Sequence, residues 1–590
     1  MRTILSALLL AVAGTAFAQP ASTIDETRLD ALVALARVHG VVRYFHPSDS
    51  LDQVDWNRFL AHAAARMGEV IDRKEIAPRL EELFAPAVEG FRVAPAGSAA
   101  TAPGGEGPVV EWRHLGYGLE DPKSLFVSWR THHRPLLGKG ASPGFFQNAG
   151  RAEASVDEEP VARVAIAGGL EAQVPISMPM SATKVGEAQA ARLQRLAATI
   201  APAAPAGDGA TRAQAHADGI ALWNVARHFY PYWPVVKLDW EEALRQWLAA
   251  QPEVQSRAQL RDALARLAAP LDDGQARVLN AGDMSERAYL PLAIRPVGSR
   301  WVVDESRVEG IRVGDELVAV DGVPVAAWYA RRAAQESGSA RFKRWRVRGA
   351  FLQGPKEAKV RLRLARGAQV LDAAIAYDSP QPIGAPRRPQ YEEVRPGIYY
   401  VDLGRVQMPE FDRMLPALRE ARGIVFDLRA NPSADARQLV RYWIRDTDGA
   451  QWMNIPRFDA PFKAPASGWS FGWQEGRDGA LDKPAKVLLA DGRSIGHAES
   501  LAAYFPAQKA GAVVGEATAG ANGNLAAATL PSGMRFVFTA MVVTRHDGSV
   551  LHVEGVRPDI EVVPTPQGIR AGRDEVLERA LQGIEAAAKR

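Results

Sequence analysis

The chain has 590 residues, of which 47% are hydrophobic and 24% charged, and its formal net charge is +3. These values are typical of globular proteins, and the length predicts several domains of roughly 100–200 residues each. The small net charge and the lack of a basic block predict no nucleic-acid partner. The absence of cysteine excludes disulfides, thiolate metal sites and a cysteine nucleophile.

The first residues, MRTILSALLLAVAGTAFAQP, have the pattern of a secretory signal. Arg2 supplies the positive charge, residues 4–12 form the apolar stretch, and Ala-Phe-Ala precedes Gln19 as the cleavage pattern. The apolar stretch is shorter than the about 20 residues that a membrane span needs. We therefore expect a signal peptide at residues 1–18, a periplasmic or extracellular location and no transmembrane segment.

Two segments of the N-terminal half repeat each other. RYFHPSDSLDQVDW begins at Arg43, and RHFYPYWPVVKLDW begins 184 positions later at Arg227. Each copy follows one apolar helical pattern and precedes another, which predicts a helix, a Pro-marked loop and a second helix. We expect helical units at residues 19–98 and 213–285, with the aromatic side chains holding each loop against its helices.

The remaining sequence divides into three further parts and a linker. Short alternating apolar runs broken by Gly and Pro predict a small β domain at 99–180, and APAAPAGDGA predicts a linker within 181–212. In residues 286–380, RVGDELVAVDGVPV resembles the strand–turn–strand of a PDZ domain, a fold that binds peptides at a sheet edge. From 385 to 590, strands such as GIVFDLR alternate with helices such as HAESLAAYF, which predicts a largely parallel layered sheet.

Several motifs of this last part follow one another in a familiar order. GIVFDLRANP, VLLADGRSIGHAES, AVVGEATAGANGN and VEGVRPDIEV together resemble the core of the tail-specific, or C-terminal processing, serine peptidases. The resemblance covers residues 271–563, and the paired helical units resemble extensions of the tricorn-like branch. It implies a multidomain α+β protein with a ClpP/crotonase-like α/β core and polypeptide substrates. No spacing of His or carboxylates indicates a metal site, and we expect no cofactor.

The resemblance also implies where the catalytic residues should lie. The family's nucleophilic Ser stands three positions before a Glu in the strand-to-helix turn, so Glu499 places this slot at Gly496. The His base of the tricorn-like branch corresponds to Gln275 in LDDGQARV, and the Lys base of the other branch to Ala521. Glycine has no attacking atom, and a glutamine amide does not accept a proton at useful pH. We therefore expect both catalytic groups to be missing.

Ser494 and Glu499, close to the nucleophile slot, have two interpretations each. Ser494 is the fallback nucleophile, with His497 as its base, or else a turn or N-cap residue. Glu499 is expected to close a capping box onto the backbone at Gly496, although a catalytic role stays open. Glu554 lies near the position where the tricorn-like branch supplies an acidic residue.

The family's oxyanion loop, DLRGNPGG, reads DLRANPSA in this chain. Its residues Asp427, Arg429, Asn431 and Ser433 are the candidate substrate-binding residues, while a purely structural ion pair between Asp427 and Arg429 is the alternative. Two functions follow from the sequence. One is an exported serine-type endopeptidase that uses Ser494, and the other, which we favour, is a pseudo-protease that binds polypeptides without cleaving them.

Overall fold

The computed structural model describes residues 25–121, 124–132, 159–200, 211–250, 254, 256–280, 287–384 and 388–587. The expected signal peptide and the APAAPAGDGA segment lie outside these ranges. Among the helices in the described ranges, none combines the length and the apolarity that a membrane crossing requires.

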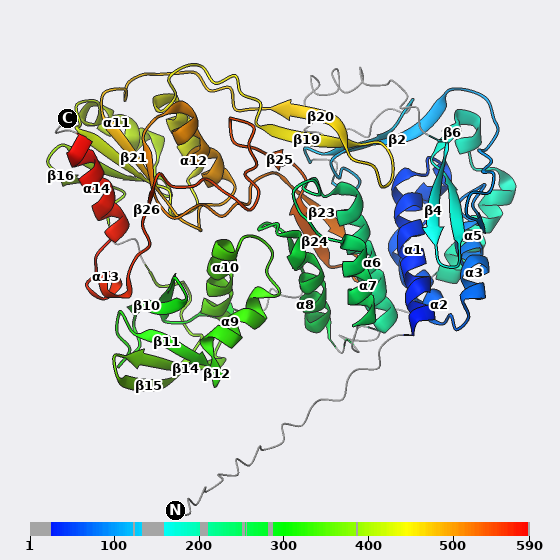
Figure 1. Cartoon of the computed structure of the whole chain (residues 1–590), viewed down its shortest axis with the longest axis horizontal. Helices are drawn as coiled ribbons and strands as arrows, with labels where there is room; N and C mark the ends of the chain where they lie inside the picture. Colours follow the sequence, from blue (N-terminus) through cyan, green and yellow to red (C-terminus); the bar gives the residue numbers. More distant parts are fainter. Residues whose placement is uncertain are drawn as a thin grey trace, which may run out of the picture.

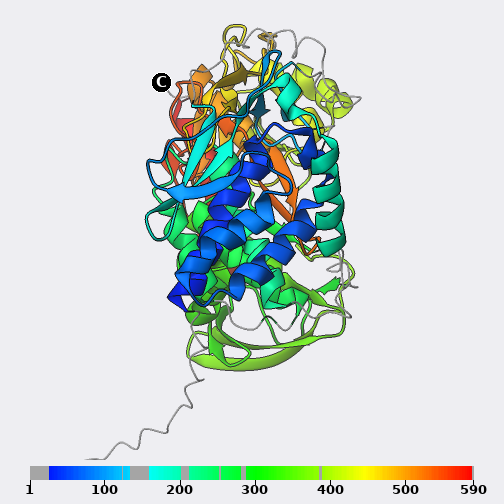
Figure 2. The same ribbon diagram turned by 90° about the vertical axis from the view of Figure 1, so that its right-hand side faces the viewer.

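Helices α1 and α6 pack against each other in the N-terminal part, whose first helices, in blue, face the viewer in Figure 2. They approach closely at Gly40, where a Cβ atom would lie 2.1 Å from Oδ1 of Asn224. Asp55 and Asp239, which occupy the same position of the repeated motif, cap α2 and α7 through their side chains. The helices of this part are α1 (Glu26–Phe45), α2 (Trp56–Gly68), α3 (Ile76–Phe84), α5 (Glu187–Ile200), α6 (Arg212–Phe229), α7 (Trp240–Ala249) and α8 (Arg257–Ala268).

The strands of the predicted small β domain do not form one separate unit. β1 (Arg92–Pro95), β5 (Leu170–Pro175) and β4 (Val161–Ile166) form one sheet beside α1. β2 (Val109–Leu115) and β3 (Val127–Arg130) instead join β19 (Met453–Phe458) and β20 (Ala466–Phe471) of the C-terminal part, with β6 (Ser177–Pro179) and β25 (Val542–Val543) at the margins. The prediction of a self-contained β domain at 99–180 is therefore wrong, because its strands pair with partners on both sides in the sequence.

The predicted linker at 181–212 also contains a helix. Within it, α5 packs its side chains Leu193, Leu196 and Ile200 into the main hydrophobic core. The spacing of these three residues places them on one helix face, so burial of that face fixes the segment against the first helical part.

Residues 287–376 form an antiparallel sheet with two helices. Its strands are β9 (Leu292–Val297), β10 (Arg300–Ser306), β11 (Glu316–Val320), β12 (Val323–Pro324), β14 (Lys359–Arg366) and β15 (Gln369–Ala376). Helices α9 (Val325–Ala333) and α10 (Ala340–Leu352) accompany it, and β8 (Arg287–Tyr289) pairs with β13 (Gln353–Pro355). The PDZ-like assignment of this part stays a prediction.

The C-terminal part is a three-layered α/β unit (Figure 1). Its sheet has the order β16–β17–β18–β21–β22–β26, in which β16 is antiparallel and the others are parallel. Helix α14 covers one face, and α11 and α12 cover the other. The elements are β16 (Tyr391–Arg395), β17 (Ile398–Asp402), α11 (Met408–Arg419), β18 (Gly423–Asp427), β21 (Ala485–Ala490), α12 (His497–Gln508), β22 (Ala512–Gly515), β26 (Ile560–Glu561), α13 (Pro566–Arg570) and α14 (Glu575–Ala587).

A smaller sheet connects this unit to the helical part. Strand β24 (Arg535–Thr539) pairs with β23 (Leu525–Thr529) on one side and with β7 (Arg277–Leu279) on the other. Because β7 begins two residues after Gln275, this sheet carries the Gln275 loop toward the C-terminal unit. The fold thus brings two segments together that are more than 200 positions apart in the sequence.

Candidate active site

Gly496 occupies the sharp turn between β21 and α12. Its backbone has φ 58° and ψ −115°, a conformation that glycine adopts without the steric cost of a Cβ. The amide of Gly496 donates to the carbonyl of Ala521 at 3.0 Å, and α12 starts at the next residue. The turn therefore presents bare backbone at the N-terminal end of a helix, where the helix dipole favours negative charge.

Gln275 lies opposite this turn. A Cβ atom built on Gly496 would lie 3.9 Å from Oε1 of Gln275, and no other atom of the described residues outside its chain neighbours comes within 4 Å. The space beside Gly496 is thus open to a side chain, and the first group that this side chain would meet is the amide of Gln275. The positions that the family resemblance assigns to nucleophile and base face each other.

A buried carboxylate fixes the backbone that carries Gln275. Asp273 accepts hydrogen bonds from the amide of Gln275 at 2.9 Å and from the amide and hydroxyl of Thr539 at 2.7 and 2.8 Å. The side chain of Gln275 donates to the carbonyl of Gly523 at 3.1 Å and to Oγ1 of Thr539 at 3.3 Å. Asp273 was not among the residues predicted from the sequence, although it stands in the same LDDGQ segment, only two positions before Gln275.

Aromatic residues of the second repeated motif contact the segments next to the Gln275 loop. The hydroxyl of Tyr230 donates to the carbonyl of Leu271 at 2.8 Å and contacts His552. Tyr232 stacks on His552 with ring centroids 3.9 Å apart, and its hydroxyl accepts from the amide of Val543 at 3.0 Å. The second helical part therefore contributes to the positioning of the Gln275 loop.

Glu499 does not cap the helix as expected. Its fully buried carboxylate accepts hydrogen bonds from Oγ1 of Thr518 at 2.6 Å and from the amides of Gly520 and Ala521 at 2.7 Å each. Burial raises the pKa of Glu499, although these hydrogen bonds act in the opposite direction. Instead of contacting the backbone of Gly496, Glu499 holds the 518–521 loop against the turn. That loop includes Ala521, the position of the alternative lysine base.

The placement of Ser494 argues against a role as nucleophile. Its side chain is fully buried, and its hydroxyl donates to the carbonyl of Leu428 at 2.8 Å. The ring of His497 instead contacts Trp473, with ring centroids 5.4 Å apart, and burial together with Arg437 lowers its pKa. These contacts agree with Ser494 as a turn residue, because its hydroxyl holds the turn to the residue that follows β18.

Glu554 is exposed and forms an ion pair with Arg557. Its backbone carbonyl accepts from Nη2 of Arg341 at 2.7 Å, and the neighbouring amide of Val553 donates to the carbonyl of Gly520. The loop that carries Glu554 therefore lies against the 518–521 loop. The carboxylate of Glu554 is committed to Arg557 in this structure.

The DLRANPSA loop contains a charged cluster. Arg429 donates to both carboxylate oxygens of Asp427 at 3.0 and 2.7 Å and to both oxygens of Asp574 at 2.9 and 2.8 Å. Tyr400 adds a hydrogen bond of 2.9 Å to Asp427. The guanidinium of Arg429 holds the pKa of Asp427 below its usual range despite burial. These contacts agree with the structural interpretation of the pair, since Arg429 links the loop to the start of α14.

The other two loop residues differ in their surroundings. Asn431 is exposed, whereas the hydroxyl of Ser433 donates to the carbonyl of Val406 at 2.7 Å. Of the predicted substrate-binding residues, Asn431 is therefore the one whose side chain is exposed to solvent.

Substitution Arg429→Ala is expected to lower the free energy of unfolding by about 3–5 kcal/mol, because it leaves the buried charge of Asp427 without its partner. Urea unfolding monitored by circular dichroism measures this loss. Arg437→Ala is the matched control, since the side chain of Arg437 is 46% exposed and pairs with Glu475. It should cost no more than about 1 kcal/mol. Equal losses of unfolding free energy in both variants would show that the buried Arg429 cluster stabilises the fold no more than an exposed ion pair does.

Comparison with known proteins identifies this unit. Residues 398–562 match the model of peptidase family S41. This part of the chain belongs to peptidase family S41. The match confirms the resemblance to tail-specific peptidases, while the tricorn-like branch stays a prediction. A comparison with curated protein sequences gave no match.

A comparison with solved structures also gave matches. Mature CPAF complexed with lactacystin has a TM-score of 0.51 and 14% identity, over 64% of this chain and 98% of that chain. The photosystem II D1 C-terminal processing protease has a TM-score of 0.36 and 21% identity, over 60% of this chain and 95% of that one. At 14% identity, the likeness to CPAF shows a similar fold and nothing about the chemistry of this chain.

Proposed function

We propose that this S41 protein binds polypeptides at a serine-peptidase site and does not cleave them. One observation carries the proposal: a side chain at position 496 would start 3.9 Å from Oε1 of Gln275, yet neither residue supplies a nucleophile or a base. Membership of a peptidase family supports polypeptides as the ligand class.

The chemistry that remains at such a site is binding. The partial positive charge at the N-terminal end of α12 favours a carbonyl or carboxylate group of a bound chain. Residual acceleration from binding and oriented amides alone reaches ~10³-fold over water in serine peptidases that lack their triad. We further propose that the protein is exported, on the basis of the signal-like pattern around Arg2, and meets its ligands outside the cytoplasm.

Reduced, unfolded casein is a suitable probe because it offers many extended segments. We expect the full chain to retain labelled casein in a pull-down while mass spectrometry finds the casein intact after prolonged incubation. A fluorophosphonate probe should leave the protein unlabelled, since the buried hydroxyl of Ser494 is already bonded to Leu428.

The outcome against the proposal is equally specific. Casein cleavage that co-purifies with the protein and disappears in Ser494→Ala would establish an active serine peptidase. If casein is neither bound nor cleaved, the proposal that this protein binds unfolded polypeptides is wrong.

A further inference from the structure

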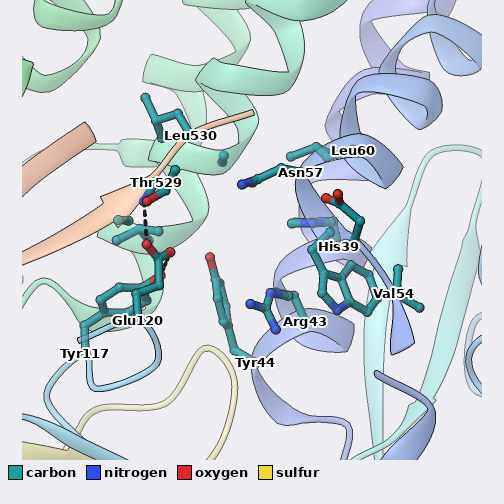
Figure 3. A pocket seen from close by; sticks show the side chains of 15 residues that line it. His39, Arg43, Tyr44, Val54, Asn57, Leu60, Tyr117, Glu120, Thr529 and Leu530 are labelled. Carbon is teal, nitrogen blue, oxygen red and sulfur yellow. Dashed lines mark hydrogen bonds between the residues drawn. The ribbon is translucent and has the colours of Figure 1, made fainter. Parts of the chain in front are cut away.

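A cavity of about 250 Å³ lies between the helical part and strand β23 (Figure 3). Its walls come from segments far apart in the sequence: α1, the start of α2, the turn after β2, α6 and the end of β23. It is separate from the Gly496–Gln275 site. Gly523, which contacts Gln275, precedes β23, whereas the cavity is lined by Ala528 and Thr529 at the far end of that strand.

Arg43 contributes an unpaired positive charge to this cavity. Its guanidinium lies 5.7 Å from the ring centroid of Trp56, and among the described residues no carboxylate pairs with it and no hydrogen bond from it is found. Other arginines of the same region are paired, including Arg130 with Asp49 at 2.7 Å and Arg245 with Asp30 at 2.9 Å. An arginine left without an acid at the wall of a cavity is suited to an anion from outside.

Two buried side chains next to Arg43 add polar groups. Tyr44 is only 4% exposed, and its hydroxyl, which Figure 3 shows pointing into the cavity, makes no hydrogen bond within the described ranges. His39 is 3% exposed, and its Nε2 atom also has no partner in the part of the chain that the structure describes. The hydroxyl of Tyr44 and the guanidinium of Arg43 are therefore both available to an anion that enters the cavity.

The acidic groups of the cavity are already engaged. Glu120 accepts from the hydroxyl of Tyr117 at 2.7 Å and from the amide of Thr529 at 2.8 Å, as Figure 3 shows. Asp55 accepts from the amide of Arg58 at 3.1 Å and pairs with its side chain at 3.2 Å. Both carboxylates belong to exposed residues, whereas Tyr44 lies inside. The cavity therefore has two engaged carboxylates at its exposed rim, the half-buried Arg43 in its wall and the buried Tyr44 inside.

We propose that this cavity binds a small carboxylate, with the carboxylate group on Arg43 and Tyr44 and the apolar part of the ligand against Trp56 and Leu60. The volume lies just below the range of roughly 300–1,000 Å³ typical of drug-sized ligands, so the ligand has about the size of one amino acid. A free amino acid and the last residue of a short peptide share this chemistry. The ammonium group of a free amino acid would face the rim carboxylate of Glu120.

Isothermal titration calorimetry on the full chain tests the proposal. The probes are the twenty L-α-amino acids, their C-terminal amides and trialanine. We expect at least one amino acid or the peptide to bind, and its amide to bind at least tenfold more weakly, because the amide removes the charge that Arg43 recognises. Trialanine binding as tightly as alanine would assign the site to peptide ends, and binding of amino acids alone to free amino acids.

Variants locate the binding in this cavity. Arg43→Gln should weaken it about 10- to 100-fold and Tyr44→Phe about fivefold, as expected for loss of a charged and of a neutral hydrogen bond. Arg66→Gln, on α2 and paired with Glu69 instead, is the control and should change nothing. The proposal is overturned if no probe binds at millimolar concentration. It is also overturned if affinity is unchanged in both cavity variants while their circular dichroism matches the wild type.

Discussion

Peptide hydrolysis should appear when Gly496→Ser and Gln275→His are combined, because the two positions face each other and the double variant supplies both missing groups. A general base typically contributes about 10²- to 10⁴-fold, so the double variant should exceed Gly496→Ser alone by that factor. Hydrolysis of a fluorogenic peptide library, followed with time, measures the rate. A histidine at 275 would stand beside Thr539, which Asp273 already fixes.

Each single variant should stay at the level of the wild type. A serine at 496 without a base is not activated, and a histidine at 275 without a nucleophile has nothing to deprotonate. The backbone of Gly496, at φ 58°, adds a cost of about 1–3 kcal/mol for any residue with a Cβ. Gly496→Ala should therefore lose as much stability as Gly496→Ser. A folded double variant that remains inactive would show that further parts of the site have changed.

The helical part should lose stability steeply as the pH falls below about 6.5. Burial lowers the pKa of His39 and His114 to about 3, and that of His46 and His216 to about 4. In the unfolded chain these side chains take up protons near pH 6.5, whereas in the folded chain they remain neutral until pH 3–4. The stabilisation is therefore complete above pH 6.5 and is lost progressively toward the folded pKa values.

The expected effect is large. At pH 5 each of these histidines lowers the free energy of unfolding by about 2 kcal/mol, and all of them together by up to about 8 kcal/mol. This total is comparable with the whole stability of a typical domain, about 5–15 kcal/mol. Urea unfolding at pH 7, 6 and 5 measures the dependence.

Single substitutions separate this effect from general acid unfolding. His216→Gln removes one buried titrating group and should reduce the loss between pH 7 and pH 5 by up to about 2 kcal/mol. His62→Gln, at a partly exposed position of α2, is the matched control and should reduce the loss by much less. A free energy of unfolding that stays constant between pH 7 and pH 5 would contradict the prediction.

The sequence predicted those parts of the fold whose patterns are local. The run GIVFD was expected to be a buried strand, and β18 is buried along its whole length because helices cover both faces of its sheet. The helix at 187–200 was not predicted, although Leu193, Leu196 and Ile200 have helical spacing, because the adjacent Pro- and Ala-rich composition is typical of a linker. The pairing of β2 with β19 could not be predicted from the sequence, since no local pattern of residues specifies a partner strand more than 300 positions away.

The candidate site shows the same division. The family resemblance assigned Gly496 to the nucleophile slot and Gln275 to the base slot, and the structure brings the two residues face to face. The spacing of Glu499 from Gly496 also matched a capping box, but the 518–521 loop returns to the turn and takes all of its hydrogen bonds. The cavity around Arg43 was not foreseen, because its walls meet only in the folded chain.

The shared sheet of β2, β3, β19 and β20 makes the C-terminal part dependent on the N-terminal part. Residues Arg457 and Phe458 of β19 find their backbone partners in Leu115 and His114 of β2. A fragment that begins after residue 211 would bare this edge, and exposed edges pair with other chains and aggregate. The two parts therefore share one sheet, and neither part can be replaced or transferred without exposing an unpaired strand.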